Sequence, residues 1–526
     1  MDSNVAELLS RAAAQEPDKT VLSEAATGRT VTCSQLDDLV SRVVQGLSDA
    51  GMVAGYRVMI ATANTIEFVA AYLGALRAGM VVVPVNPRSA TGELIRMMAD
   101  SGTRMVIADR GTISAVREAA GGLGEAMEAA GYESAARPRI VTVGTTLAPG
   151  ERSWDQLIAT HGRPGPSRLD PEGLAVLLYT SGTSGRPRAA MLSHRALLAN
   201  IEQVARVEPQ TITGRDVVLG VLPLFHVYGL NAVLGQVLRQ KARLVLVDGF
   251  DPEGSLDLIE DEAISVLPVA PPVFAYWMQV PGLEDRLGPV RLVLSGSAPL
   301  DPDLTGAFTA RTNVDIHQGY GLTEAAPVVT STLCSKEPTP RSVGAALPGI
   351  DIRLVDENGR EPRDEDGGEI HIRGANLFSG YWPDGSDGPD SEGWWATGDV
   401  GYLDPSGDLY LVDRLKELVI VSGFNVYPSE VEDVITELPD VAEAAVIGVD
   451  DEATGEAVVA FVRPTTAGAS DNLGDVVRRH CQDRLARFKQ PSVIHVVEEL
   501  PYTPTGKVQK GRLRAAERRR ALGLLE

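Results

Sequence analysis

The sequence predicts an α/β fold with a large N-terminal domain and a smaller C-terminal domain. Short apolar segments alternate with helical patterns from residue 58 onward, which is typical of parallel βαβ units. From about residue 342, alternating polar and apolar residues are broken by Asn-Gly and Ser-Gly turns, which predicts antiparallel hairpins. We therefore expect residues 1–412 to form two βαβ-type lobes plus a small antiparallel β unit at about 342–412. A hinge at 413–416 and a mobile α+β domain at 417–526 would follow.

The individual elements follow from hydrophobic periodicity and from helix-capping signals. A first helix is expected at 5–14, and a second begins at a capping-box variant, Ser34-Gln35-Leu36-Asp37, and ends near Gly51. In the first lobe we expect strands at 58–61, 81–85 and 105–108 and helices at 67–78 and 93–99. Residues 111–138 predict a helical excursion on the surface. In the second lobe we expect strands at 217–221, 243–247, 264–269 and 291–294 and helices at 230–239 and 255–262.

Composition excludes several classes of protein. A net charge of −23 argues against nucleic-acid binding, and the Lys/Arg-rich segment 507–520 is expected to be a solvated helix. Cys33, Cys334 and Cys481 have no paired spacing, which is typical of a reducing cytoplasm and disfavours a disulfide framework or a zinc site. The N-terminus does not resemble a signal peptide, and no apolar run approaches the ~20 residues of a membrane span. We expect a cytoplasmic protein without an integral membrane segment.

Residues 179–194, YTSGTSGRPRAAMLSH, predict a phosphate-binding loop between a buried strand and a helix that begins at Ser193. Glycines allow backbone N–H groups to face an anion, hydroxyls add donors, and arginine adds a charged fork. The candidate phosphate ligands are Thr180, Ser181, Gly182, Thr183, Ser184, Gly185 and Arg188. An ordinary surface loop is the alternative. A P-loop hydrolase is disfavoured because the Walker Gly-Lys-Ser/Thr is missing.

Other stretches carry groups suited to chemistry, although each has a plain structural alternative. Small residues in SGSAPL, 295–300, follow a predicted strand, where ligands bind in doubly wound sheets. In HQGYGLTE, 317–324, Tyr320 offers a stacking face, Thr323 a hydroxyl for phosphate, and Glu324 a hard oxygen ligand suited to Mg²⁺. Asp399 after Gly398 can accept ribose hydroxyls. The structural alternatives are a tight turn for 295–300, a helix cap for Thr323 and Glu324, and a turn position for Asp399.

The phosphate loop resembles that of the adenylate-forming superfamily, which contains acyl-CoA synthetases, luciferases and adenylation domains. Six motifs occur in the family's order, and in look the chain is most similar to fatty-acid–CoA ligases. It departs at Arg188, where the family has lysine, and at Ala189, where it has glycine. Alanine would cost roughly 1–2 kcal/mol there if that position needs positive φ.

The resemblance implies a role for each matching residue. It assigns the acyl pocket to His226, Val227, Tyr228, Gly229, Phe274 and Gly296, with His226 as a wall or gate. It assigns the nucleotide to Ser297, Ala298, Pro299, Gln318, Gly319, Tyr320, Gly321 and Thr323, with Asp399 and Arg414 on the ribose and Glu324 on Mg²⁺. Lys416 would be the hinge, Gly423 and Phe424 would border the CoA path, and Lys507 would be the catalytic lysine. Lysines of some relatives are replaced here by Ile420 and Ser422.

The implied activity is an ATP-dependent acyl-CoA ligase that uses Mg²⁺ and coenzyme A and releases AMP and pyrophosphate. A fatty acid is the expected substrate. Val227, Tyr228 and Phe274 offer no charged partner for an amino group, which disfavours an amino-acid-activating domain. The length of the acyl chain, and the choice between an aliphatic and an aryl acid, stay open. The alternatives are an acyl-AMP ligase that loads an acyl carrier protein, and a nucleotide-binding homologue with impaired catalysis, which Arg188 and Ala189 motivate.

Overall fold

The computed structural model describes most of the chain. The described residues are 3–129, 137–162, 170–180, 188–298, 300–339, 341–356, 359–362, 367–414, 417–421, 424–451, 454–465, 472–485, 487–503 and 506–521. The chain divides into two compact units. The first contains Met1–Gly182, Arg186–Asp351 and Arg373–Trp395, and the second contains Thr183–Gly185, Ile352–Ile372 and Ala396–Glu526. The predicted border at 412–417 stays a prediction, since these units group most of the antiparallel sheet with the C-terminal residues.

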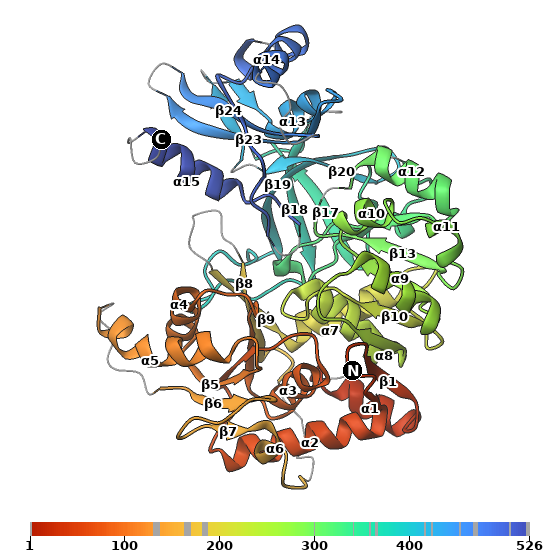
Figure 1. Cartoon of the computed structure of the whole chain (residues 1–526), viewed down its shortest axis with the longest axis vertical. Coiled ribbons are helices and arrows are strands. Elements are labelled where there is room, and N and C mark those ends of the chain that lie inside the picture. The colour runs from red at the N-terminus through yellow and green to blue at the C-terminus, as the bar shows by residue number, and fades with distance from the viewer. Residues whose placement is uncertain are drawn as a thin grey trace. The chain divides into compact units, whose positions relative to one another are not determined.

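The first sheet of unit one is the expected βαβ layer (Figure 1). Its strand order is β7-β6-β5-β3-β4-β8-β9, and every neighbouring pair except β8–β9 is parallel. The strands are β3 (Arg57–Ala61), β4 (Val81–Pro84), β5 (Thr103–Ala108), β6 (Arg139–Thr142), β7 (Arg152–Ser153), β8 (Leu174–Thr180) and β9 (Arg188–Ser193). The helices are α1 (Glu7–Gln15), α2 (Cys33–Asp49), α3 (Ile66–Arg77), α4 (Thr91–Ser101), α5 (Ile113–Ala129) and α6 (Trp154–Leu157).

Local chemistry sets the helix ends, with one correction to the prediction. The capping box of α2 is formed by Thr32 and Gln35, two residues before the predicted cap, because the Thr32 hydroxyl accepts from the Gln35 N–H. Gly51 follows the helix with a φ of 68°, as its predicted role at the C-terminal end requires.

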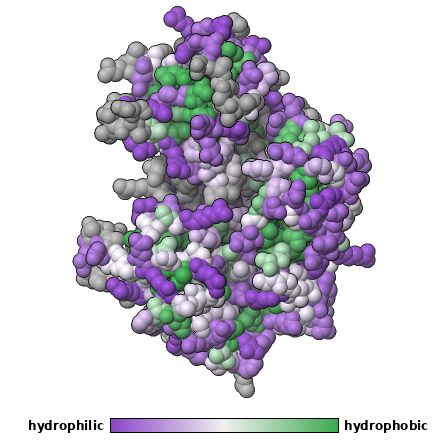
Figure 2. Space-filling model, in the orientation of Figure 1, coloured by the Kyte–Doolittle hydropathy of each residue, from purple (hydrophilic) through white to green (hydrophobic). Residues whose placement is uncertain are grey.

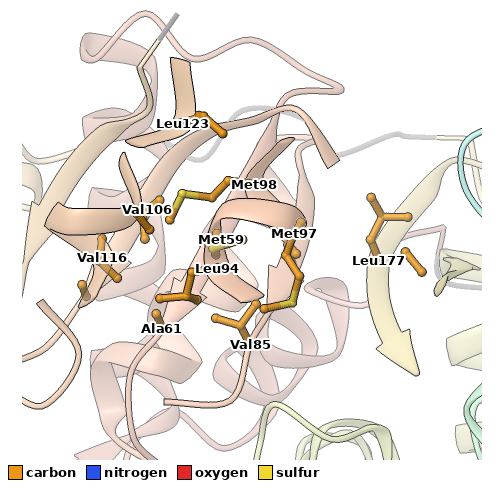
Figure 3. Packing of buried hydrophobic residues seen from close by; sticks show 14 of the residues in the cluster. Met59, Ala61, Val85, Leu94, Met97, Met98, Val106, Val116, Leu123 and Leu177 are labelled. Atoms are coloured by element: carbon orange, nitrogen blue, oxygen red, sulfur yellow. The ribbon is translucent and has the colours of Figure 1, made fainter. Parts of the chain in front are cut away.

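A hydrophobic core lies between this sheet and helices α4 and α5. Figure 3 shows Leu94 and Met98 of α4 packed with Met59 of β3 and Val106 of β5. The prediction of a surface excursion at 111–138 was wrong for α5, because Leu123 and its neighbours on one face of the helix are buried in this core. The sparse pattern of alanines and glycines concealed an amphipathic helix.

The second sheet has the order β14-β13-β12-β10-β11-β1-β2 and is parallel except for β1–β2. Its strands are β1 (Thr20–Glu24), β2 (Thr30–Thr32), β10 (Val217–Gly220), β11 (Arg243–Leu246), β12 (Val266–Val269), β13 (Leu292–Ser295) and β14 (Ile316–Gln318). Its helices are α7 (His194–Ala205), η1 (Tyr228–Gly235), α8 (Gln236–Gln240), α9 (Pro252–Asp261), α10 (Pro272–Trp277), α11 (Leu283–Arg286) and α12 (Pro302–Thr312). Short elements follow at η2 (Thr323–Ala325), β15 (Thr330–Ser331), η3 (Thr332–Cys334) and β16 (Ala345–Ala346).

The small antiparallel unit predicted from about residue 342 is a four-stranded sheet, although antiparallel pairs also occur earlier, in β1–β2, β8–β9 and β15–β16. The four-stranded sheet has the order β17 (Ile350–Val355), β18 (Gly368–Gly374), β19 (Trp394–Leu403), β20 (Leu409–Arg414). The C-terminal part contains β21 (Val419–Val421), β22 (Phe424–Val426), α13 (Pro428–Thr436), β23 (Val441–Asp451), β24 (Gly455–Pro464), α14 (Leu473–Arg484), η4 (Arg487–Lys489), β25 (Val493–Val496) and α15 (Lys510–Ala521).

The C-terminal sheet has a hydrophobic cluster on each face. Val431, Ile435 and Cys481 of α13 and α14 belong to one cluster, and Leu513 of α15 packs with Phe461 of β24 in the other. Apart from this anchor, α15 is largely solvated, as its charge pattern predicts. Hydrophilic side chains cover much of the visible surface in Figure 2. Among the described residues, no helix has both the length and the apolar composition to cross a membrane.

Candidate active site

The candidate phosphate loop connects two antiparallel strands, β8 and β9. Thr180 and Arg188 face each other across this hairpin, and the Thr180 hydroxyl donates to the Arg188 carbonyl oxygen at 3.3 Å. Ser181, Gly182, Thr183, Ser184 and Gly185 lie outside the described residues. The prediction of a loop leading directly into a helix missed β9, although Ser193 caps α7 as expected. The loop is therefore anchored at both ends by the same ladder.

Ala189 carries no backbone strain. It pairs with Tyr179 inside the β8–β9 ladder and is absent from the residues with positive φ. An alanine is fully compatible with extended backbone, so the cost considered for a left-handed residue does not arise.

Arg188 lies in a cluster of residues that are far apart in the sequence. Its guanidinium pairs with the Asp387 carboxylate at 2.7 Å, and its central carbon lies 3.8 Å from the centre of the Tyr381 ring. The Tyr381 hydroxyl donates to Glu324 Oε1 at 2.6 Å. Burial, and then the nearby Glu324 carboxylate, raise the pKa of Tyr381, so the hydroxyl keeps the proton that it donates. Tyr381 and Asp387 were not among the predicted residues.

Three buried amide side chains hold the turn that carries Glu324. Asn376 donates to the Ala325 carbonyl oxygen and Asn231 to that of Ala326, both at 2.7 Å. Asn200 exchanges two hydrogen bonds with the backbone of Val328. Glu324 itself is 8% exposed. The sequence analysis missed these asparagines, because an isolated Asn in a helix (Asn200, Asn231) or in a turn (Asn376) carries no signal of the distant backbone that it binds.

The Glu324 carboxylate fits a magnesium ion that arrives with a nucleotide. One of its oxygens accepts from Tyr381, which leaves the carboxylate oriented and able to accept further partners. Mg²⁺ in phosphate sites is usually held by one or two carboxylates together with phosphate and water oxygens. Among the described residues there is no group of three or more His, Cys, Asp and Glu side chains that could hold a metal by itself. A single carboxylate therefore suits a metal shared with phosphate.

The segments predicted to bind adenine leave adjacent parallel strands. Ser295 at the end of β13 pairs with Gln318 at the end of β14, and the Gly319 N–H donates to the Ser295 carbonyl oxygen at 3.2 Å. Ser297 has a φ of 78°, a left-handed conformation that costs a non-glycine residue roughly 1–2 kcal/mol. Backbone strain of this type is concentrated at functional sites. Ala298 continues this segment, and Pro299 lies outside the described residues.

The glycines around Tyr320 allow close packing of two chain segments. A Cβ on Gly319 would lie 2.7 Å from the Thr330 carbonyl oxygen, and one on Gly321 would meet the Pro327 carbonyl. Tyr320, predicted as a stacking face, is 7% exposed between these two glycines. Thr323 begins the short η2 turn directly before Glu324.

Four of the six predicted acyl-pocket residues form one group. A Cβ on Gly296 would lie 3.2 Å from the Tyr228 ring, so the tyrosine packs directly on this glycine. Tyr228 begins the π-helix η1, an element frequent at functional sites, and its N–H donates to Nδ1 of His226 at 3.3 Å. Gly229 packs against the Pro223 carbonyl. Burial raises the pKa of the Tyr228 hydroxyl, although the side chain remains partly accessible.

The other two predicted pocket residues pack as core residues. Val227 is 1% exposed, and Phe274 has no exposed surface. The Phe274 ring makes edge contacts with Phe308 and Trp277, at centroid distances of 5.2 and 6.3 Å. The contacts of Phe274 are therefore those of the second sheet's core and give no support to a role in the pocket wall.

The second unit contains the remaining predicted residues. Asp399 is 6% exposed and lies opposite Arg414 in the β19–β20 ladder, where Gly398 has a φ of 74°. Lys507 is exposed on a turn in which its N–H donates to the Thr503 hydroxyl at 3.0 Å and its carbonyl accepts from the Thr503 N–H at 2.7 Å. Phe424 begins β22, whereas Lys416 and Gly423 lie outside the described residues.

Comparisons with known proteins cover almost the whole chain. The family model described as AMP-binding enzyme matches residues 9–382, and that of the AMP-binding enzyme C-terminal domain matches 430–507. The chain is 34% identical to 4-coumarate–CoA ligase 5 of Oryza sativa subsp. japonica, over 95% of this chain and 92% of that protein.

Two solved structures have the same fold. ATP-bound MatB from Rhodopseudomonas palustris matches with a TM-score of 0.87 and 32% identity, over 98% of this chain and 99% of that one. A Mycobacterium tuberculosis fatty acyl CoA synthetase matches with a TM-score of 0.75 and 28% identity, over 98% of each chain.

Proposed function

This chain belongs to the AMP-binding enzyme family, the adenylate-forming enzymes, and from that premise we propose that it is an acid–CoA ligase releasing AMP and pyrophosphate. Its substrates would be ATP, a carboxylic acid and coenzyme A. The observation that carries the proposal is the adjacency of the segments after β13 and β14, with Glu324 on the buried turn beyond them. Ligands of doubly wound sheets bind at the carboxyl ends of such strands.

The first half-reaction joins two anions. A carboxylate oxygen of the acid attacks the α-phosphorus of ATP, the bond to pyrophosphate breaks, and an acyl-adenylate forms. Positive charge must be positioned where negative charge develops, and we propose that Lys507 supplies it. Arg188 would bind the triphosphate through its forked donors. A Mg²⁺ bound at Glu324 would neutralise part of the phosphate charge.

The second half-reaction forms the thioester. The thiol sulfur of coenzyme A attacks the acyl carbon, AMP leaves with the oxygen that joined it to the acyl group, and the thiol proton is released. We propose that the C-terminal domain presents Lys507 for the first step and the segment around Gly423 for the second, with Lys416 as the pivot. Asp399 and Arg414 would hold the ribose. Domain closure of this type gates many enzymes.

For the acid, we propose an aromatic carboxylate as the first candidate. The pocket group of His226, Tyr228 and Gly296 offers an aromatic face for a planar ring, the Tyr228 ring, which Gly296 allows to lie close to the backbone. The similarity to a coumarate ligase supports this choice over the fatty acid expected from the sequence. A fatty acid is the second candidate, supported by the apolar run at 222–230 and by the likeness to a fatty acyl CoA synthetase.

The test is AMP release from ATP with a panel of acids, with and without coenzyme A. The panel contains hydroxycinnamic and benzoic acids and fatty acids of increasing chain length, and the thioester is identified by mass. A thioester formed only with a holo-carrier protein would make the chain a carrier-loading ligase instead. If ATP binds and no acid of the panel releases AMP or exchanges pyrophosphate, the ligase proposal is wrong.

Lys507→Ala tests the charge assignment. We expect the adenylation rate to fall by about 10²- to 10³-fold, the usual loss for one preorganised charge at a developing anion. Arg519→Ala is the matched control, because it removes an exposed positive charge from the following helix. Equal rates for the two variants would remove Lys507 from the mechanism.

A further inference from the structure

We infer that Tyr381 is a positioning residue that couples two charged groups, the Arg188 guanidinium and the Glu324 carboxylate. The inference rests on the proposed function and assigns this tyrosine to the step in which magnesium and triphosphate bind. All three residues belong to the first unit.

The backbone around Tyr381 is held against β9. The Ser379 N–H donates to the Met191 carbonyl oxygen at 2.9 Å, and the Trp382 N–H donates to that of Ala189 at 2.9 Å. Tyr381 itself forms an antiparallel bridge with Ala190. Segment 379–382 therefore lies beside the strand that carries Arg188, and their relative positions are set by backbone hydrogen bonds.

The Phe378 ring restricts the Tyr381 ring, and the next residue in the chain, Trp382, is itself anchored. The Phe378 ring lies edge-on at a centroid distance of 5.0 Å. Trp382 is fixed by a 2.9 Å hydrogen bond from its indole N–H to the Asp100 carbonyl oxygen. A side chain with two rotatable bonds that is packed in this way loses little further conformational entropy when a ligand binds to its partners.

The two parts of the tyrosine side chain have different partners. The ring face carries the Arg188 guanidinium at 3.8 Å, a cation–π contact that restrains a long side chain. The hydroxyl donates to Glu324 Oε1 at 2.6 Å, a charge-assisted hydrogen bond that orients the carboxylate. One rigid side chain thus sets the positions of a cation and an anion that come from β9 and η2.

This geometry suits the binding of a magnesium–triphosphate complex. The carboxylate would be held ready for the metal and the guanidinium for phosphate oxygens. Asp387 pairs with Arg188 from the solvent side and is 69% exposed, so the pair is weak and a phosphate can replace it. Tyr381 would form no bond with the reacting atoms and would act through its two partners.

Two substitutions separate the roles of hydroxyl and ring. Tyr381→Phe removes the hydroxyl and keeps the face, whereas Tyr381→Leu removes both. Calorimetric titration of the whole protein with ATP is done with Mg²⁺ and then with EDTA. Tyr276→Phe is the matched control, since it deletes the hydroxyl of a 52% exposed tyrosine in the same unit.

We expect Tyr381→Phe to weaken ATP binding with Mg²⁺ by about 10- to 100-fold, as for the loss of a hydrogen bond to a charged group. Binding with EDTA should be nearly unchanged, although the melting temperature should fall by a few degrees because the buried Glu324 carboxylate loses a donor. Tyr381→Leu should in addition weaken ATP binding with EDTA by several-fold, because Arg188 loses the aromatic ring on which its guanidinium stacks. A merely structural role would weaken ATP binding equally with Mg²⁺ and with EDTA.

A double-mutant cycle with Glu324→Gln completes the test. The quantity compared is the ratio of the ATP affinity with Mg²⁺ to the ATP affinity with EDTA. If Tyr381 acts through Glu324, adding Tyr381→Phe to Glu324→Gln should change this ratio by less than twofold. Unchanged Mg²⁺-dependent binding in Tyr381→Phe would overturn the inference while leaving the ligase proposal intact. Wild-type protein that binds ATP equally with and without Mg²⁺ would overturn it too, and AMP release from the acid panel would still decide the ligase proposal.

Discussion

Acid should destabilise the first unit through His194, the first residue of α7. The side chain is 2% exposed, and its Nδ1 accepts a hydrogen bond from the Val5 N–H at 3.3 Å. Burial lowers the pKa of His194 from 6.5 to about 4, and Glu7 opposes this shift. Protonating Nδ1 would remove the acceptor for Val5 and place a cation at a helix N-terminus, where the dipole disfavours it.

The magnitude follows from the difference in pKa between the folded and unfolded states. Below pH 6.5 the unfolded chain binds a proton at His194 that the folded chain does not bind. The free energy of unfolding should therefore fall by ~1.4 kcal/mol per pH unit, until folded His194 is protonated near pH 4. The full loss is roughly 3 kcal/mol. Above pH 6.5 the contribution is complete and does not change with pH.

The assay is urea unfolding between pH 7 and pH 4, followed by tryptophan fluorescence. All 5 tryptophans lie within the first unit, so the signal reports on the unit that contains His194. His194→Asn is the comparison, because an asparagine oxygen can replace Nδ1 as acceptor for Val5 and does not titrate. Its stability deficit at pH 7 should shrink by about 3 kcal/mol at pH 4. A constant deficit across this range would refute the reasoning.

Three further substitutions test other parts of the fold and site. Gly319→Ala should weaken ATP binding by tenfold or more in calorimetry, since its Cβ would lie 2.7 Å from the Thr330 carbonyl oxygen; unchanged affinity would show that the strand ends can move apart. Phe308→Ala should cost about 3–5 kcal/mol in urea unfolding, because the ring is fully buried, and a loss below about 1 kcal/mol would contradict this packing. Burial alone would raise the pKa of Asp216, but hydrogen bonds led by Arg291 hold it at about 2. Stability should therefore fall by about 2 kcal/mol between pH 4 and pH 2, and Asp216→Asn, measured in the same titration, should lack that loss.

The strands and helices that alternate in the first 300 residues were predicted well because their signal is local. The apolar runs at 58–61 and 81–85 form β3 and β4 almost as predicted. The failures also have local causes. Helix α2 is capped by Thr32, two residues before the predicted cap Ser34, because both residues can cap a helix. The buried face of α5 was missed because its sequence is rich in alanine and glycine. Strand β9 was missed because a basic residue and two alanines give little strand signal by themselves.

The sequence predicted the short motifs of the site and did not predict the contacts between residues that are distant in the chain. The string at 317–324 indicates Glu324 because glycine, tyrosine, threonine and glutamate stand together in the sequence. Nothing in the sequence indicates that Tyr381 reaches Glu324, or that Asn231 supports the same turn. These contacts join residues more than 50 positions apart, and hydrophobic periodicity contains no information on such pairs.

The sequence by itself determined the class of fold, the order of its elements, and the residue types available for nucleotide chemistry. Each of these depends on a few neighbouring residues, through backbone preference, side-chain spacing or the identity of a short string. Only the tertiary structure decided that β1 and β2 complete the second sheet, that Phe274 packs in its core, and that one tyrosine joins Arg188 to Glu324. Such pairings depend on how whole elements pack, because burial and close approach are settled by the complete set of long-range contacts.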